Sequence, residues 1–243
     1  HCNYGPSTDY SEAELQNLWA HYAAESELVD RHIGRVLQKL DDLELWDDTI
    51  VVITSDHGTS IGEHNRTGKS NICDHDERYW PIYPEVSHVP FLIGGGAIPA
   101  GVSLQMLAQP VDILPTLAEL ADVNLEPREP FEGISFASCL RDGTENHREL
   151  SVTGGFVKPT ADAMVPPEST TPWVTDGRWG FAPVGHNGPA ELFDLSVDPF
   201  AEQDVAADHT DVTGSLFDGF IDHLQKHNAS KELVKCWTNN NAD

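Results

Sequence analysis

The 243-residue chain carries little positive charge, since 14 Lys and Arg stand against 40 Asp and Glu, for a formal net charge of −26. Nucleic acids and anionic membranes are bound through basic patches, so this balance argues against both as partners. Such a charge also repels itself, and salt relieves the repulsion because the Debye length falls to about 3 Å at 1 M. The composition favours the cytoplasm of a high-salt cell; secretion and an ordinary acidic protein are the alternatives.

Long hydrophobic runs and paired cysteines are also absent from the sequence. No stretch approaches the roughly 18 consecutive apolar residues of a membrane span, so no span is expected. The first ten residues lack the basic start and apolar stretch of a signal peptide. No C-x-x-C pair is present, which argues against a zinc ribbon or a thioredoxin-like motif. We expect isolated thiols, with two disulfides as the alternative, from the four cysteines Cys2, Cys73, Cys139 and Cys236.

Hydrophobic patterns give the first 146 residues an α/β character. A capping box at Ser11 followed by apolar residues at helical spacing predicts a long helix over residues 11–40. Residues 49–53, "TIVVI", are β-branched on both faces, which is typical of an interior strand in a mostly parallel sheet. A second buried strand is predicted over residues 87–93 and a further helix over residues 110–123.

The pattern changes beyond about residue 146 to short strands. Asp176 and Gly177 form a hairpin turn signal between two of these strands. Residues 214–227 show the periodicity of a closing helix. We therefore predict an α/β domain over residues 1–146, with a mixed sheet between helices. A smaller antiparallel α+β subdomain is predicted over residues 147–243.

The loop after the 49–53 strand concentrates groups that bind ions. Open α/β sheets place their ligands at the carboxyl ends of strands, and Asp56 and His57 occupy such an end. The Asp carboxylate suits Ca²⁺ or Mg²⁺, whereas His also suits zinc or manganese. The Lys69 ammonium can meet an anion held at the metal. These three residues alone leave open a structural role, in which Asp56 only caps a turn.

The motifs together resemble the sulfatase family of the alkaline phosphatase superfamily. They run in the family's order: "DDTIVVITSDHGTSIGEH", "GKS", "HVPFLIGGG" and "VDILPTLAELADV". "ELFDLSVDPFAEQDVA" is similar to a late segment of the family, and residues 22–48 resemble the helix before its metal-binding strand. The resemblance covers most of the chain. It implies an alkaline-phosphatase-like α/β fold and hydrolysis of sulfate esters on sulfated small molecules or carbohydrates.

The resemblance also implies roles for individual residues. Asp56 and His57 match two ligands of a single divalent cation, usually Ca²⁺, with Mg²⁺ or Mn²⁺ as alternatives. Lys69 matches the lysine that contacts the sulfate oxygens and stabilises the leaving oxygen. His1 in "HCNYGP" matches a histidine that contacts the substrate ester and assists leaving-group protonation, although Asn3 replaces the family's proline.

Two further comparisons with the family concern the Gly-Glu-His motif and the nucleophile. Glu63 and His64 form the Gly-Glu-His motif, and we expect them to shape the loop and not to perform chemistry. Sulfatases use a formylglycine nucleophile made in a C/S-x-P-x-R motif, and none of the four cysteines lies in one. The chain thus resembles the C-terminal part of a sulfatase, with the formylglycine expected in an N-terminal part. A phosphodiesterase, a phosphonate monoester hydrolase and a catalytically dead cation-binding relative remain alternatives.

The acidic composition generates a prediction about salt. If the charge is an adaptation to brine, the melting temperature should climb steeply between about 0.1 M and above 1 M KCl as the repulsion is screened. Calorimetry across that range measures it. A melting temperature that stays flat contradicts the adaptation.

Overall fold

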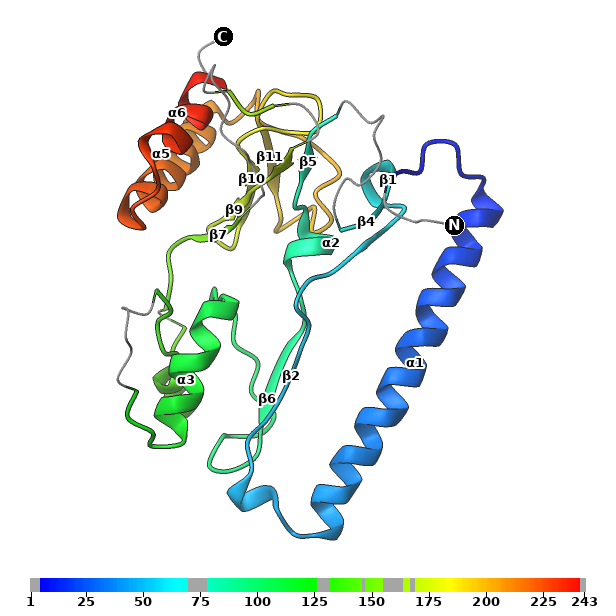
Figure 1. Ribbon diagram of the computed structural model, residues 1–243, viewed down its shortest axis with the longest axis vertical. Helices are drawn as coiled ribbons and strands as arrows, with labels where there is room; N and C mark the ends of the chain where they lie inside the picture. The colour runs from blue at the N-terminus through cyan, green and yellow to red at the C-terminus, as the bar shows by residue number, and fades with distance from the viewer. Residues whose placement is uncertain are drawn as a thin grey trace.

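A computed structural model describes residues 5–69, 78–125, 132–145, 147–154, 164–166 and 169–240 of the chain. A long helix stands along one side of the molecule, and a four-stranded sheet lies on the other side toward one end, with two helices beside it (Figure 1). Two extended strands run side by side between them (Figure 1). The described helices include none that is both long and apolar enough to cross a membrane.

Helix α1 (Glu12–Asp42) begins where the sequence predicts. The Ser11 side chain accepts a hydrogen bond from the Glu14 backbone and the Glu14 carboxylate accepts one from the Ser11 backbone, which completes the capping box. None of the 31 residues of α1 is buried. The Trp19 indole nitrogen donates to the Ile61 carbonyl at 2.7 Å and ties the helix to the rest of the chain.

Strands β2 (Val51–Thr54) and β6 (Phe91–Gly94) overlap the strands predicted over 49–53 and 87–93. β6 begins later than predicted, because Ser87 ends a short helix and residues 88–90 lie in no strand. The two strands are antiparallel, with Val52 opposite Ile93, so the parallel environment predicted for β2 is wrong. Neither strand is buried within the described residues. Apolar residues on both faces of a strand predict that both faces can be buried. They do not predict whether the neighbouring strand is parallel or antiparallel. The short 3₁₀ helix η1 (Trp46–Asp48) leads into β2.

A small three-stranded antiparallel sheet follows β2. Its order is β1–β4–β3, from Gly5–Pro6, Arg66–Gly68 and Ser60–Ile61. The turn between β3 and β4 contains the 3₁₀ segment η2 (Glu63–Asn65). Because Lys69 directly follows β4, this hairpin determines where the Lys69 backbone lies.

The segment from β5 (Trp80–Pro81) to helix α2 (Pro84–Ser87) connects the hairpin to the C-terminal sheet. β5 pairs in parallel with β8 (Thr170–Thr171). Buried side chains of this segment join a core cluster with side chains from the sheet: Ile82, Tyr83, Val86, Trp173, Ala182, Phe193 and Ala201. This segment is therefore fixed by the sheet and can serve as a support for what packs on it.

The C-terminal sheet is antiparallel, as the sequence predicts. Its order is β11–β10–β9–β7, from Glu191–Asp194, Trp179–Ala182, Trp173–Thr175 and Ser151–Thr153. Asp176 and Gly177 form the predicted turn between β9 and β10, with Gly177 at φ 96°. Helices α5 (Thr210–Lys226) and α6 (Lys231–Asn240) pack on the sheet through Phe220 and Trp237. Helix α6 was not predicted, because ten residues give only about three turns of periodicity.

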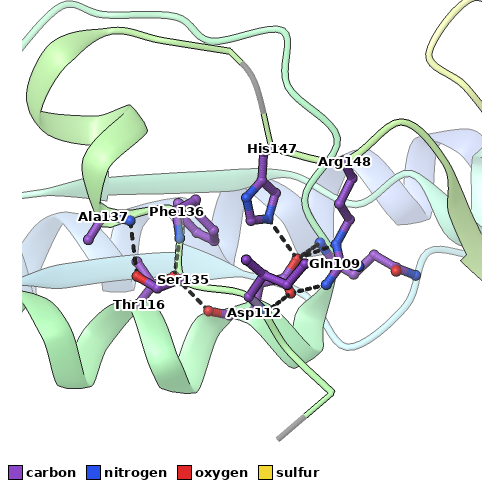
Figure 2. Close-up of polar contacts among 9 residues, drawn as sticks. Gln109, Asp112, Thr116, Ser135, Phe136, Ala137, His147 and Arg148 are labelled. Carbon is purple, nitrogen blue, oxygen red and sulfur yellow. Dashed lines mark hydrogen bonds and ion pairs between the residues drawn. The ribbon is translucent and has the colours of Figure 1, made fainter. Parts of the chain in front are cut away.

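Asp112 ties the residues around helix α3 to the chain that enters the C-terminal sheet. It ends the 3₁₀ helix η3 (Pro110–Asp112), which leads into α3 (Ile113–Leu120), with the short α4 (Ala137–Asp142) alongside. Its fully buried carboxylate pairs with the Arg148 guanidinium, whose Nε lies 2.9 Å away, and contacts His147 at 3.2 Å (Figure 2). Pro115 lies in the first turn of α3, where proline is tolerated.

Backbone groups also donate hydrogen bonds to this buried carboxylate. The backbone N–H groups of Gln109 and Ile134 donate to Asp112 at 2.9 and 2.8 Å. Burial alone would raise the pKa of Asp112, but the Arg148 guanidinium and these N–H groups outweigh it and hold the pKa below its ordinary value. The stabilisation is therefore present at neutral pH and is lost as the pH falls through the lowered pKa.

Breaking this buried pair should destabilise the protein far more than breaking an exposed one. Arg148→Gln leaves a buried carboxylate without its main counter-charge and should lower the free energy of unfolding by about 3–5 kcal/mol. The matched control is Arg31→Gln, because Arg31 pairs with Glu27 on α1 with both side chains more than half exposed. That change should cost less than about 1 kcal/mol. Urea unfolding at pH 7 measures both, and equal losses contradict the ranking.

Candidate functional site

The loop after β2 brings Asp56, His57 and Lys69 together. Asp56 and His57 follow the strand directly, and Lys69 returns to them at the end of the β3–β4 hairpin. The Lys69 ammonium nitrogen lies 2.6 Å from His57 Nε2. His57 Nε2 lies 3.5 Å from Asp56 Oδ2. The structure thus gathers the three residues that the sequence singles out in this loop.

Hydrogen bonds fix the ring of His57 in one tautomer. Nδ1 lies 2.7 Å from the carbonyl oxygen of Gly58, which can only accept, so Nδ1 carries the proton. The Lys69 ammonium can only donate, so Nε2 presents the lone pair that accepts its hydrogen bond. A histidine whose other nitrogen donates to a backbone carbonyl is the usual form of a metal ligand.

Close backbone packing holds the start of the loop against α2. The Gly58 N–H donates to the Val86 carbonyl at 2.8 Å. A Cβ added at Gly58 would lie 2.0 Å from the Glu85 carbonyl oxygen, so only glycine permits this approach. Asp56 itself remains exposed over 85% of its side chain, with one carboxylate oxygen accepting from the His57 N–H at 3.1 Å. Its second oxygen is thus accessible to a ligand.

A cavity of about 360 Å³ opens beside these three residues. Asp56, His57 and Lys69 line one part of it. The remaining wall is mostly apolar and comes from α2, β6, η3, α3 and their neighbours, including Ile82, Val86, Val89, Phe91, Ile113 and Phe136. The cavity thus combines the three charged or titratable groups of the loop with a largely apolar wall.

Sequence reasoning missed several residues of this cavity. His88 and Gln109 line it, and neither was predicted as a site residue. His88 could have been found from its position immediately before the Val-Pro strand. The Gln109 side chain donates to the Val152 carbonyl at 2.8 Å, a long-range contact that no local pattern reports.

The remaining predicted site residue, His1, lies outside the described residues. Gly5, the first described residue, pairs with Thr67 on β4, two residues before Lys69. Among the described residues, no three His, Cys, Asp or Glu side chains form a group that could hold a metal ion. Asp56 and His57 therefore supply only part of a coordination shell. A carboxylate oxygen and an imidazole nitrogen 3.5 Å apart are a donor set that fits such a part.

The profile of the family described as "Sulfatase" matches residues 2–123, half of the chain. This chain belongs to the sulfatase family. It is 29% identical over 215 residues to arylsulfatase K from Mus musculus, covering 85% of this chain and 36% of that protein. It is 27% identical over 199 residues to choline-sulfatase from Rhizobium meliloti (strain 1021), covering 82% of this chain and 35% of that protein. The sulfatase chain thus spans just over a third of the length of these relatives.

Solved structures confirm the predicted alkaline-phosphatase-like fold. A 2-O GAG sulfatase superposes with a TM-score of 0.72 at 23% identity, covering 93% of this chain and 48% of that one. A phosphonate monoester hydrolase of Agrobacterium radiobacter superposes with a TM-score of 0.68 at 24% identity, covering 90% of this chain and 43% of that one. Both enzymes share the scaffold that carries the loop, so the fold alone does not separate their chemistries.

Proposed function

We propose that this sulfatase chain supplies the lysine and part of the cation site for hydrolysis of sulfate esters. The observation that carries the proposal is the placement of Lys69 Nζ 2.6 Å from His57 Nε2, beside Asp56, in one cavity at the end of β2. Membership of the family supports it, because sulfatases generally use a divalent cation and a formylglycine. The residues gathered here suit a tetrahedral dianion or monoanion that needs a metal and an ammonium around it.

Lys69 would bind the sulfate group through its ammonium. A sulfate ester develops negative charge on the leaving oxygen as the S–O bond breaks, and a fixed positive charge nearby lowers the barrier. The β3–β4 hairpin holds the Lys69 backbone beside the loop that carries Asp56 and His57. The His57 Nε2 lone pair accepts from the Lys69 ammonium here, and the ammonium would have to leave it for a cation to bind there. The chain thus offers an exposed lysine whose ammonium lies at a defined place beside the loop.

Asp56 and His57 would hold the divalent cation, which when bound polarises the sulfate oxygens. Ca²⁺ takes six to eight oxygen ligands, so these two residues need further ligands from outside the described residues. We propose Ca²⁺ as the ion, with Mg²⁺ or Mn²⁺ as alternatives, because Asp56 is a hard oxygen donor while His57 suits a broader range of ions.

His1 is proposed as a second group on the substrate ester, where an imidazole can give a proton to the leaving oxygen. The pairing of Gly5 with Thr67 supports this, because it brings the described end of the N-terminal stretch beside the strand that leads to Lys69. The nucleophile would be a formylglycine supplied by a C/S-x-P-x-R motif, which these 243 residues do not contain.

The substrate is proposed to be a sulfated small molecule or carbohydrate. The largely apolar wall of the cavity supports a leaving group with an apolar face beside the charged end. We also propose that residues 1–146 and 147–243 form two domains. The acidic composition supports a location in the cytoplasm of a high-salt cell.

Phosphonate monoester hydrolysis is the second candidate, favoured by the superposition on the Agrobacterium radiobacter enzyme. The same lysine and cation could serve a phosphonate, because both substrates are tetrahedral anions. Rates on an aryl sulfate and on an aryl phosphonate, compared in one active form of the protein, separate the two. If the protein binds a cation but hydrolyses neither substrate, the result favours a catalytically dead relative that binds a cation.

One prediction of the proposed function concerns the cation. The 243-residue chain should bind Ca²⁺ weakly, because it supplies two of about six ligands. Asp56→Ala should abolish that binding, whereas Asp30→Ala on the exposed face of α1 should leave it unchanged. Isothermal titration calorimetry at low ionic strength measures the affinity. An Asp56→Ala chain that binds Ca²⁺ as the parent does would remove Asp56 from the site.

Another prediction of the proposed function concerns Lys69. The 243 residues alone should not turn over an aryl sulfate, because they lack the nucleophile motif. In a form of the protein that does, Lys69→Ala should lower kcat by about 10²–10³, the loss expected for a preorganised charge at the developing anion. The matched control is Lys39→Ala in the last turn of α1, which should change nothing. A fully active Lys69→Ala enzyme contradicts the role of Lys69.

A further inference from the structure

His64 lies at the tip of the hairpin that joins the two parts of the candidate site. β3 leaves the Asp56–His57 end and β4 returns to Lys69, with Ser60 opposite Gly68 in the pairing. His64 and its neighbour Asn65 adopt left-handed backbone conformations, with φ 50° and 56°. Such conformations are costly for residues other than glycine and persist where the surroundings fix them.

Both ring nitrogens of His64 meet groups that accept hydrogen bonds. Nδ1 lies 2.9 Å from Glu85 Oε1, and Nε2 lies 2.8 Å from the Ala201 carbonyl oxygen. A carbonyl oxygen can only accept, so Nε2 carries a proton; an ionised carboxylate can only accept, so Nδ1 carries one too. The contacts therefore call for the doubly protonated, positively charged imidazolium.

The surroundings of His64 favour that charge. Its ring stacks on the ring of Tyr83, with centroids 3.7 Å apart and planes 7° apart, as a cation does on an aromatic face. Burial alone lowers the pKa of His64, but the Glu85 carboxylate, the Ala201 carbonyl and the charge of Glu191 outweigh it and raise the pKa above its ordinary value.

Other charged and titratable groups around Tyr83 complete this environment. The Tyr83 hydroxyl donates to Glu191 on β11, and burial together with that carboxylate raises the pKa of Tyr83. His186 Nδ1 lies 2.6 Å from Glu191 Oε1. The Arg66 guanidinium on β4 lies over the Trp80 ring at 4.1 Å and donates to the Tyr79 carbonyl. The positive charge of Arg66 opposes that of His64, whereas two carboxylates support it.

The His64 ring joins three segments that are far apart in the sequence. It belongs to the hairpin, Glu85 belongs to α2, and Ala201 is fully buried after β11 with φ 54°. Ser60 on β3 also donates to Glu85, at 3.1 Å. If the ring lost one proton, either the Glu85 carboxylate or the Ala201 carbonyl would lose the hydrogen bond from His64 in a place that water reaches poorly.

We propose that His64 is a positioning residue, a protonated latch that fastens the β3–β4 hairpin to α2 and the C-terminal sheet and opens as the pH rises. The latch itself is independent of the chemistry; its consequence for Lys69 rests on the proposed function. Closed, it holds β4 and the Lys69 backbone against a rigid support. Open, it releases the hairpin that carries Lys69.

The direction of the pH effect follows from the contacts. A histidine that gains a partner on folding stabilises the protein fully below its unfolded-state pKa of about 6.5. The stabilisation is lost as the pH rises through the higher pKa of the folded state. Alkaline pH should therefore open the latch.

The test compares thermal unfolding of the 243-residue chain between pH 6 and pH 9. His64→Gln should lower the melting temperature at pH 6 by about 4 °C or more, and the difference from the parent should be smaller at pH 9. Glu85→Gln should behave as His64→Gln does, because it removes the partner charge. His32→Gln on exposed α1 is the matched control and should follow the parent at every pH. A His64→Gln loss that is the same at both pH values overturns the latch.

A second measurement needs no substitution. Ring ¹⁵N spectra of the parent chain should show both nitrogens of His64 protonated at pH 7, and the hydrogen-exchange protection factors of the 60–68 amides should fall as His64 deprotonates. A neutral His64 ring at pH 7, or exchange that ignores its titration, overturns the proposal. If the latch is found but Lys69→Ala stays fully active in an active form, the proposed function fails and the latch stands.

Discussion

The position of the candidate site depends on one short segment, Trp80 to Ser87, being held rigidly by the C-terminal sheet. Tyr83 is buried there against Trp173 and Phe193, and its hydroxyl is bound by Glu191. The loop that carries Asp56 and His57 packs on this segment through the backbone of Gly58. The hairpin after it contacts the segment through the side chain of Glu85. The relative positions of Asp56, His57 and Lys69 thus depend on packing in a different part of the chain.

The distribution of burial explains why the support comes from that direction. Both core clusters are built around the C-terminal sheet, with α5 and α6 contributing to one and the 82–86 residues to the other. By contrast, α1 has no buried residue, and β2 and β6 are only half-buried or exposed. Most of the apolar surface removed from water, and with it most of the stabilisation, therefore lies at the C-terminal sheet.

The sequence predicted those features that depend on neighbours along the chain. The Ser11 capping box, the helix that follows it and the turn at Asp176 and Gly177 follow from local rules, and the structure confirms them. Family motifs also located the loop whose three polar residues meet. The antiparallel direction of β6 was not predicted, because strand direction is set by partners. Nor were the contacts of His64 with residues 21 and 137 positions away, which exist only after folding.

The exposed helix α1 has a consequence for how molecules of this sulfatase chain meet in solution. Trp19, Tyr22 and Val29 are each about half exposed, so the helix shows apolar surface along much of its length. Exposed apolar surface promotes association between copies, whereas a net charge of −26 keeps copies apart. Added salt then has two opposite effects: it relieves repulsion inside one molecule, and it removes the barrier that keeps the helices of two molecules from sticking. Ionic strength therefore acts on the apolar face of α1 and on the charge of the chain at once.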